Sequence, residues 1–107
     1  MFSVRRYLTP EGRDVVGQWL ASLRDVRARA RILTRIDRLT AGNFGDCKPL
    51  RDGVSELRID HGPGYRLYYS RVGKVVVLLL CGGDKRTQNA DIERAVELLT
   101  DFKRRSK

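Results

Sequence analysis

The segment Gly53–Gln88 constrains the fold more than any other part of the chain, because it has the pattern of three successive strands joined by turns. The expected strands span Val54–Asp60, Tyr65–Arg71 and Lys74–Cys81. Glycine is present at every joint, which is typical of tight turns. The third strand carries the unbroken apolar run VVVLLL. We therefore expect this strand to be covered on both faces and to lie inside the sheet.

Period-two alternation in the first two strands determines which of their side chains share a sheet face. Leu57 of the first strand can face the same layer as Leu67 of the second only if an odd number of residues connects the strands. We expect that register, because it gathers the apolar side chains of both strands on one face. It places Arg58, Arg66 and Tyr68 together on the opposite face.

The two arginines admit two interpretations. Like charges repel each other at short range, so Arg58 and Arg66 either share an anionic ligand or are solvated side chains that pair with Glu56 or Asp60. The second interpretation is the commoner one for an arbitrary domain. Composition shifts the balance toward the first, because 22 Lys and Arg against 13 Asp and Glu give a net charge of +9. Such a charge favours nucleic acid, an acidic protein or an anionic membrane surface as partner.

Composition also disfavours several classes of protein. No apolar run reaches the roughly 18 residues of a membrane-spanning helix, so we expect no such segment. The first ten residues lack the apolar core of a secretory signal, which favours a cytoplasmic location. The cysteines Cys47 and Cys81 lie far apart and the chain has one histidine. These counts fit a reducing compartment and predict neither a metal site nor a cofactor.

Cap residues and apolar spacing predict the elements outside the central segment. Phe2–Leu8 alternates as a short strand, and Thr9 has the position of a helix N-cap. Asp25 is the expected N-cap of a second helix that runs to about Thr40. We expect Asn43–Asp52 to be a loop that leads into the sheet. A last helix follows the third central strand.

The second helix carries apolar and basic residues in nearly equal number. We expect its buried side to consist of Val26, Ala30, Ile32, Leu33, Ile36 and Leu39. The remaining surface would carry Arg24, Arg27, Arg29, Arg31, Arg35 and Arg38. A solvated basic face and a ridge that follows a phosphate backbone are equally good interpretations of these arginines.

These patterns together predict one α+β domain over residues 1–107. An N-terminal strand is followed by an αα-hairpin that packs on one sheet face. A three-stranded antiparallel meander then completes a four-stranded sheet, and a helix ends the domain.

The stretch GDCKPLRDGVSELRIDHGPGYRLYY, followed by VVVLLLCGGDKRTQNADIERA, resembles the HigB-like addiction module killer branch of the RelE/ParE toxin superfamily. The resemblance implies a RelE-like fold and a toxin encoded beside an antitoxin. In this branch the antitoxin is a small helix-turn-helix protein that binds operator DNA. RelE-like members are metal-independent endoribonucleases that cut mRNA on the ribosome, so the resemblance implies mRNA, the ribosome and the antitoxin as partners.

The resemblance also implies which residues act in catalysis. Arg58 and Arg66 match the arginines of the two family strands, and their guanidinium forks suit a phosphate. Lys48 is the candidate general base, and Lys85, or alternatively Arg86, would stabilise or protonate the leaving 5′-oxygen. Additional contacts to RNA are expected from Arg51, Tyr68 and Arg86, with the tyrosine stacking on a base. His61 could serve as a base, but its place in a Gly-Pro-Gly turn favours an ordinary turn role.

Two alternative functions remain open at this point. ParE-like members of the same superfamily inhibit DNA gyrase by binding it, and a fold does not determine a function. A non-catalytic basic domain that binds nucleic acid would also account for the charge. A cleavage assay on mRNA and a supercoiling assay with gyrase would discriminate among these classes.

Overall fold

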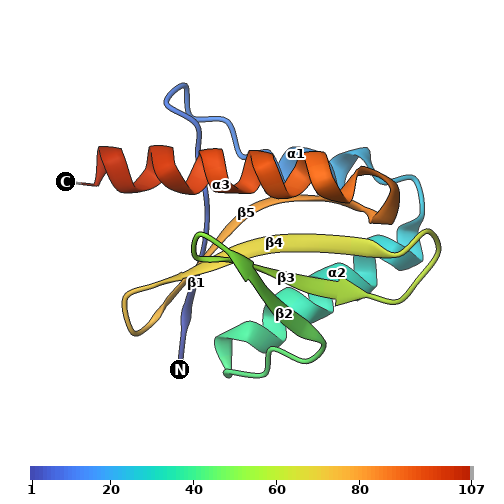
Figure 1. Ribbon diagram of the computed structural model, residues 1–107. Coiled ribbons are helices and arrows are strands. Elements are labelled where there is room, and N and C mark those ends of the chain that lie inside the picture. The colour runs from blue at the N-terminus through green and yellow to red at the C-terminus, as the bar shows by residue number, and fades with distance from the viewer. Residues whose placement is uncertain (107) are drawn as a thin grey trace.

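The computed structural model describes residues 1–106 and shows a five-stranded sheet with helices on both faces (Figure 1). The strand order is β1-β5-β4-β3-β2. β1 runs parallel to β5, and all other neighbouring strands are antiparallel. In chain order the elements are β1 (Ser3–Arg6), α1 (Val15–Ser22), α2 (Val26–Thr40), β2 (Cys47–Arg51), β3 (Val54–Ile59), β4 (Tyr65–Val72), β5 (Val76–Asp84), the 3-10 helix η1 (Lys85–Thr87) and α3 (Gln88–Arg105).

The register of β3 and β4 confirms the prediction from alternation. Leu57 pairs with Leu67, and Arg58 pairs directly with Arg66. The five residues numbered 60 to 64 connect the two strands, which is the odd number that this register requires. β5 lies between β1 and β4, so the prediction that its apolar run belongs inside the sheet is also confirmed.

The sheet has five strands where the sequence predicted four. Cys47–Arg51, which we expected to be part of a loop, forms β2 at the sheet edge and pairs with β3. Its sequence CKPLR shows no alternation. Backbone pairing with β3 and a tight turn hold this strand in place, and the burial of one face contributes little. The turn consists of Asp52 and Gly53, which both have positive φ, at 52° and 82°. Asp-Gly in this conformation is a strong hairpin signal.

Two apolar cores lie on the two sheet faces. The αα-hairpin of α1 and α2 packs on one face, as predicted, with Ile32 and Leu39 against Leu57 and Leu67. α3 covers the other face, where Leu99 is in the same core as Val54, Tyr68 and Leu80. Figure 1 shows α2 and α3 on opposite sides of the strands. No helix within residues 1–106 is both long enough and apolar enough to cross a bilayer.

The start of α1 differs from the prediction. Asp14, not Thr9, is the N-cap, and its carboxylate accepts a hydrogen bond from the Gly17 amide at 2.9 Å. Gly12 has a φ of +86°, which a right-handed helix excludes, so the chain turns before the helix begins. Thr9 stabilises that turn, because its hydroxyl oxygen accepts from the Arg13 amide at 3.0 Å.

α2 begins after the Asp25 N-cap and ends at Thr40, as predicted, but only three of its six expected core residues, Ile32, Ile36 and Leu39, lie in or against the core. The fully buried residues are Ala28, Ile32 and Leu39. The expected core residues Val26 and Leu33 are 70% and 40% exposed, and Ala30 is exposed as well. The reason lies in two arginines that flank the buried stripe and donate to backbone carbonyls of neighbouring segments. These are Arg29, which binds Leu20 and Leu23, and Arg35, which binds Phe44, Asp46 and Arg58.

Candidate functional site

Arg58 of β3 and Arg66 of β4 lie side by side on the sheet face that α3 covers, at the end of the sheet near the start of that helix. Both line an open groove of about 590 Å³, together with Lys85 of η1. We call this hollow the groove; its lining is Asp46, Arg58, Asp60, Gly62, Pro63, Gly64, Arg66 and Lys85. The predicted meeting of the two arginines and Lys85 is therefore confirmed.

A close approach of α3 to β5 brings Lys85 to the groove. Gly83 lies opposite Arg66 in the sheet. A Cβ atom at position 83 would collide with the carboxylate of Asp91, in the first turn of α3, and would crowd the Thr87 hydroxyl. Glycine lets η1 and the first turn of α3 pack directly on the sheet at this point without displacing these side chains. The glycine therefore sets the position of Lys85 relative to the two arginines.

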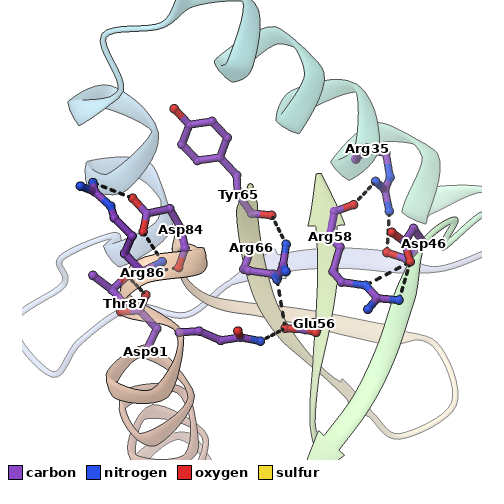
Figure 2. A network of polar contacts seen from close by, with 11 residues as sticks. Arg35, Asp46, Glu56, Arg58, Tyr65, Arg66, Asp84, Arg86, Thr87 and Asp91 are labelled. Carbon is purple, nitrogen blue, oxygen red and sulfur yellow. Dashed lines mark hydrogen bonds and ion pairs between the residues drawn. The ribbon is translucent and has the colours of Figure 1, made fainter. Parts of the chain in front are cut away.

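Arg58 is held by a carboxylate at the start of β2. Its Nε and Nη2 donate to Oδ1 of Asp46 at 3.1 and 2.8 Å. Arg35 supports both residues from α2, because its guanidinium donates to the carbonyl oxygen of Arg58 at 2.7 Å and to that of Asp46 at 3.1 Å (Figure 2). The side chains of Arg58 and Asp46 remain 39% and 54% exposed. An anionic ligand can therefore reach Arg58.

Arg66 is held more firmly, by a buried carboxylate. Its Nε lies 3.5 Å from Oε2 of Glu56, which is an ion-pair distance without hydrogen-bond geometry. Gln88, the first residue of α3, donates to the same Glu56 oxygen at 3.2 Å. The side chains of Glu56 and Arg66 are 3% and 15% exposed. Arg66 therefore pairs with Glu56, as one interpretation expected, but it is not the solvated side chain which that interpretation assumed. Figure 2 shows Arg66 beside Glu56, and Arg66 also lines the groove.

The groove lining carries a net charge of only +1. Its lining carries the three cations Arg58, Arg66 and Lys85 and the two carboxylates Asp46 and Asp60. Within residues 1–106, no three His, Cys, Asp or Glu side chains gather in a way that could hold a metal ion.

Two of the other predicted site residues lie close to the groove but outside its lining. Lys48 is exposed on β2 and pairs with Glu56 across the strands, one row away from Arg58. Arg86 points away from the groove, and its 82% exposed side chain binds Asp84 at 3.1 Å. That hydrogen bond from Arg86 is the main reason why the pKa of Asp84 is lowered.

The structure does not bring the last two predicted RNA-binding residues to the groove. Arg51 lies at the opposite end of β2, where its guanidinium pairs with Asp52 and Glu93. Tyr68 shares a sheet face with Arg66, as expected, but its side chain is completely buried beneath α3. Burial, with the nearby Glu56 carboxylate, raises the pKa of Tyr68. Stacking on a base needs an exposed ring face, so this structure contradicts the predicted role of Tyr68.

His61 has a structural partner. Its Nε2 lies 3.0 Å from Oδ2 of Asp25, so it connects the loop between β3 and β4 to the N-cap of α2. The Ala28 amide and then His61 lower the pKa of the Asp25 carboxyl. This contact supports the turn role that the sequence favoured over a role as general base.

Sequence reasoning missed Asp46, Arg35 and Gln88. Asp46 could have been found only by predicting β2, because its place beside Arg58 follows from that pairing. Arg35 carries no signal that separates it from the other arginines of α2. Gln88 reaches Glu56 only because α3 begins directly above the sheet.

Comparison with known proteins identifies relatives over most of the chain. Residues 18–100 match the profile of a family described as "Phage derived protein Gp49-like". A relative from Haemophilus influenzae, named "Uncharacterized protein", is 56% identical over 77 residues, which are 72% of this chain and 78% of the relative. The part that matches the family profile contains β2 to β5 and η1, and so the entire lining of the groove.

Proposed function

Because this chain belongs to the phage-derived Gp49-like family, whose members are in general toxin-like proteins of the RelE and HigB type, we propose that it is the toxin of a type II toxin–antitoxin module. We further propose that it belongs to the HigB-like branch and inhibits translation by cleaving mRNA without a metal ion. The observation that carries this proposal is the direct cross-strand pairing of Arg58 and Arg66 at an open groove that also contains Lys85.

The proposed reaction uses the RNA's own 2′-hydroxyl as nucleophile. The 2′-oxygen attacks the adjacent phosphorus, a 2′,3′-cyclic phosphate forms, and the bond from phosphorus to the 5′-oxygen breaks. Arg58 and Arg66 bind the non-bridging oxygens, where negative charge increases in the transition state. Their forked guanidinium groups suit that task and also hold the phosphate in line for attack.

Two proton transfers complete the reaction. The 2′-hydroxyl loses its proton to a base, for which Lys48 is our candidate on the strand next to Arg58. The leaving 5′-oxygen gains a proton from Lys85, which lines the groove beside Arg66. Proton transfer by a positioned side chain typically contributes about a hundredfold to ten-thousandfold in rate.

The proposed partners follow from the family to which the chain belongs. The substrate is mRNA, presented on the ribosome in the cytoplasm. The antitoxin is a small helix-turn-helix protein, through which the complex would bind operator DNA. Its acidic side chains would compete with phosphate for Arg58, whose present partner Asp46 is exposed.

The test compares two neighbouring cations of η1. Lys85 and Arg86 are both exposed, but only Lys85 lines the groove. We expect Lys85→Ala to lower cleavage of ribosome-bound mRNA by at least about a hundredfold. Arg86→Ala should keep nearly full activity, and both variants should unfold at the same temperature. Primer extension on the mRNA measures the cleavage.

Arg66 is best tested with lysine. Alanine would leave the buried Glu56 carboxylate without its cation, at a cost of about 3–5 kcal/mol. Arg66→Lys keeps the charge but removes the fork, so we expect a folded protein with strongly reduced cleavage. Equal activity of wild type and Arg66→Lys, or no cleavage by the wild type together with inhibition of gyrase supercoiling, would refute the nuclease.

A further inference from the structure

A second hollow lies next to the groove, between α2 and the end of β3. Its volume is about 390 Å³, within the range of pockets that hold small ligands. We call it the α2 hollow; its lining includes Ala30, Arg31, Thr34, Arg38, Ile59 and Asp60. Thr34 and Arg38 follow Arg31 by three and seven residues, so they share one face of the helix.

Two residues connect the α2 hollow to the groove. Asp60 lines both of them. Arg35 lines the α2 hollow and donates to the carbonyl oxygen of Arg58, whose side chain lines the groove. The two hollows therefore meet at Asp60, which directly follows β3.

The distribution of charge shows why a polyanion needs the second hollow. The groove contains three cations and two carboxylates, and the buried Glu56 lies beneath it. Little net attraction for a polyanion remains there, although the chain has a net charge of +9. At the α2 hollow Arg31 and Arg38 are exposed, and neither guanidinium has a hydrogen bond or an ion pair within residues 1–106. Both arginines are therefore free to bind an anion.

We propose that the α2 hollow binds a nucleotide that flanks the cleaved bond, as a second RNA subsite. The apolar surface of Ala30 and Ile59 receives the base, and Arg31 and Arg38 bind the flanking phosphates. The RNA strand passes around the end of β3 at Asp60. The negative charge of the Asp60 carboxylate repels the RNA phosphates there. This inference rests on the proposed function of the groove, because it names where the rest of the substrate lies.

The test measures binding of single-stranded RNA by fluorescence anisotropy. A 12-nucleotide RNA and a 3-nucleotide RNA, both with 2′-O-methyl groups that prevent cleavage, serve as probes. Each exposed cation contributes about threefold to affinity, so Arg31→Gln/Arg38→Gln should weaken binding of the long RNA by roughly tenfold. The slope of log affinity against log salt should fall by about 0.7 for each lost phosphate contact. The short RNA, which fits in the groove alone, should bind both proteins equally.

Two further variants complete the design. Lys74→Gln/Lys103→Gln removes the same charge at the far end of the sheet and of α3, so it should leave the salt slope unchanged. Asp60→Asn removes the opposing carboxylate and should strengthen binding of the long RNA. If both double variants bind the long RNA equally well, the α2 hollow is not an RNA subsite.

The two proposals can fail separately. If the protein binds RNA in the expected pattern but cleaves none on ribosomes, the nuclease is refuted and the α2 hollow remains an RNA site. If the protein cleaves mRNA while Arg31→Gln/Arg38→Gln binds and cleaves like the wild type, the subsite is refuted and the nuclease remains.

Discussion

Replacing Asp46 with asparagine should strengthen RNA binding while leaving the fold almost as stable. Asp46 is the carboxylate that holds Arg58 in the free protein, and a phosphate must displace it to bind the same guanidinium. Asparagine has nearly the same shape and keeps an acceptor oxygen. It removes only the negative charge that competes with the ligand.

The size of the effect follows from exposure. The side chains of Asp46 and Arg58 are 54% and 39% exposed, so solvent screens their attraction strongly. Exposed ion pairs contribute about 0.2–1 kcal/mol, which sets an upper limit of about 1 kcal/mol for the loss in free energy of unfolding. The same free energy opposes phosphate binding in the wild type. Its removal should therefore improve RNA affinity by up to about fivefold.

Asp52→Asn is the matched control. Asp52 also pairs with an arginine, Arg51, but at the opposite end of β2. The two variants change the net charge equally, and asparagine tolerates the positive φ of residue 52. Anisotropy with the 12-nucleotide RNA measures affinity, and urea denaturation measures stability. Weaker RNA binding by Asp46→Asn than by Asp52→Asn would show that the Asp46 carboxylate assists phosphate binding, and would refute the argument.

Three other substitutions test the surroundings of the groove. Tyr68→Phe should raise the free energy of unfolding by about 1 kcal/mol in urea and leave cleavage unchanged, because the buried hydroxyl has no hydrogen-bond partner. Gly83→Ala should lower both the melting temperature and cleavage, since the methyl group collides with Asp91. Burial raises the pKa of the Cys81 thiol from 9.0 to about 12, so the thiol favours folding below pH 9 and loses that contribution as the pH rises toward 12. Urea denaturation at pH 8 and pH 10 should therefore show a larger loss of stability for the wild type than for Cys81→Ala.

Alternation predicted the central sheet well because it acts over short distances. Leu57 and Leu67 set the register of β3 and β4, and that register alone brought Arg58 and Arg66 together. β2 was missed because an edge strand of this kind is held through its backbone and buries little. The only local signal for it was the Asp-Gly turn before β3.

The site was harder to predict than the fold. Alternation predicts on which sheet face a side chain lies, but not whether another element packs over it. Tyr68 and Arg66 share a face two residues apart. α3 covers Tyr68 completely and begins just short of Arg66, and no residue of β4 indicates where that boundary lies. Arg51 was misplaced for a related reason. It is close to Lys48 in sequence, but the two residues lie near opposite ends of β2. Glu93 of α3 attracts the guanidinium of Arg51.

The central position of β5 has a consequence for synthesis of the chain. β1 is made first, yet within residues 1–106 its one strand neighbour is β5, which lies some seventy residues later. While the ribosome is still adding residues before Val76, both β1 and β4 lack that neighbour, and η1 with its Lys85 has not been made. A nascent chain that ends before Val76 therefore cannot present an assembled groove to the ribosome that is producing it.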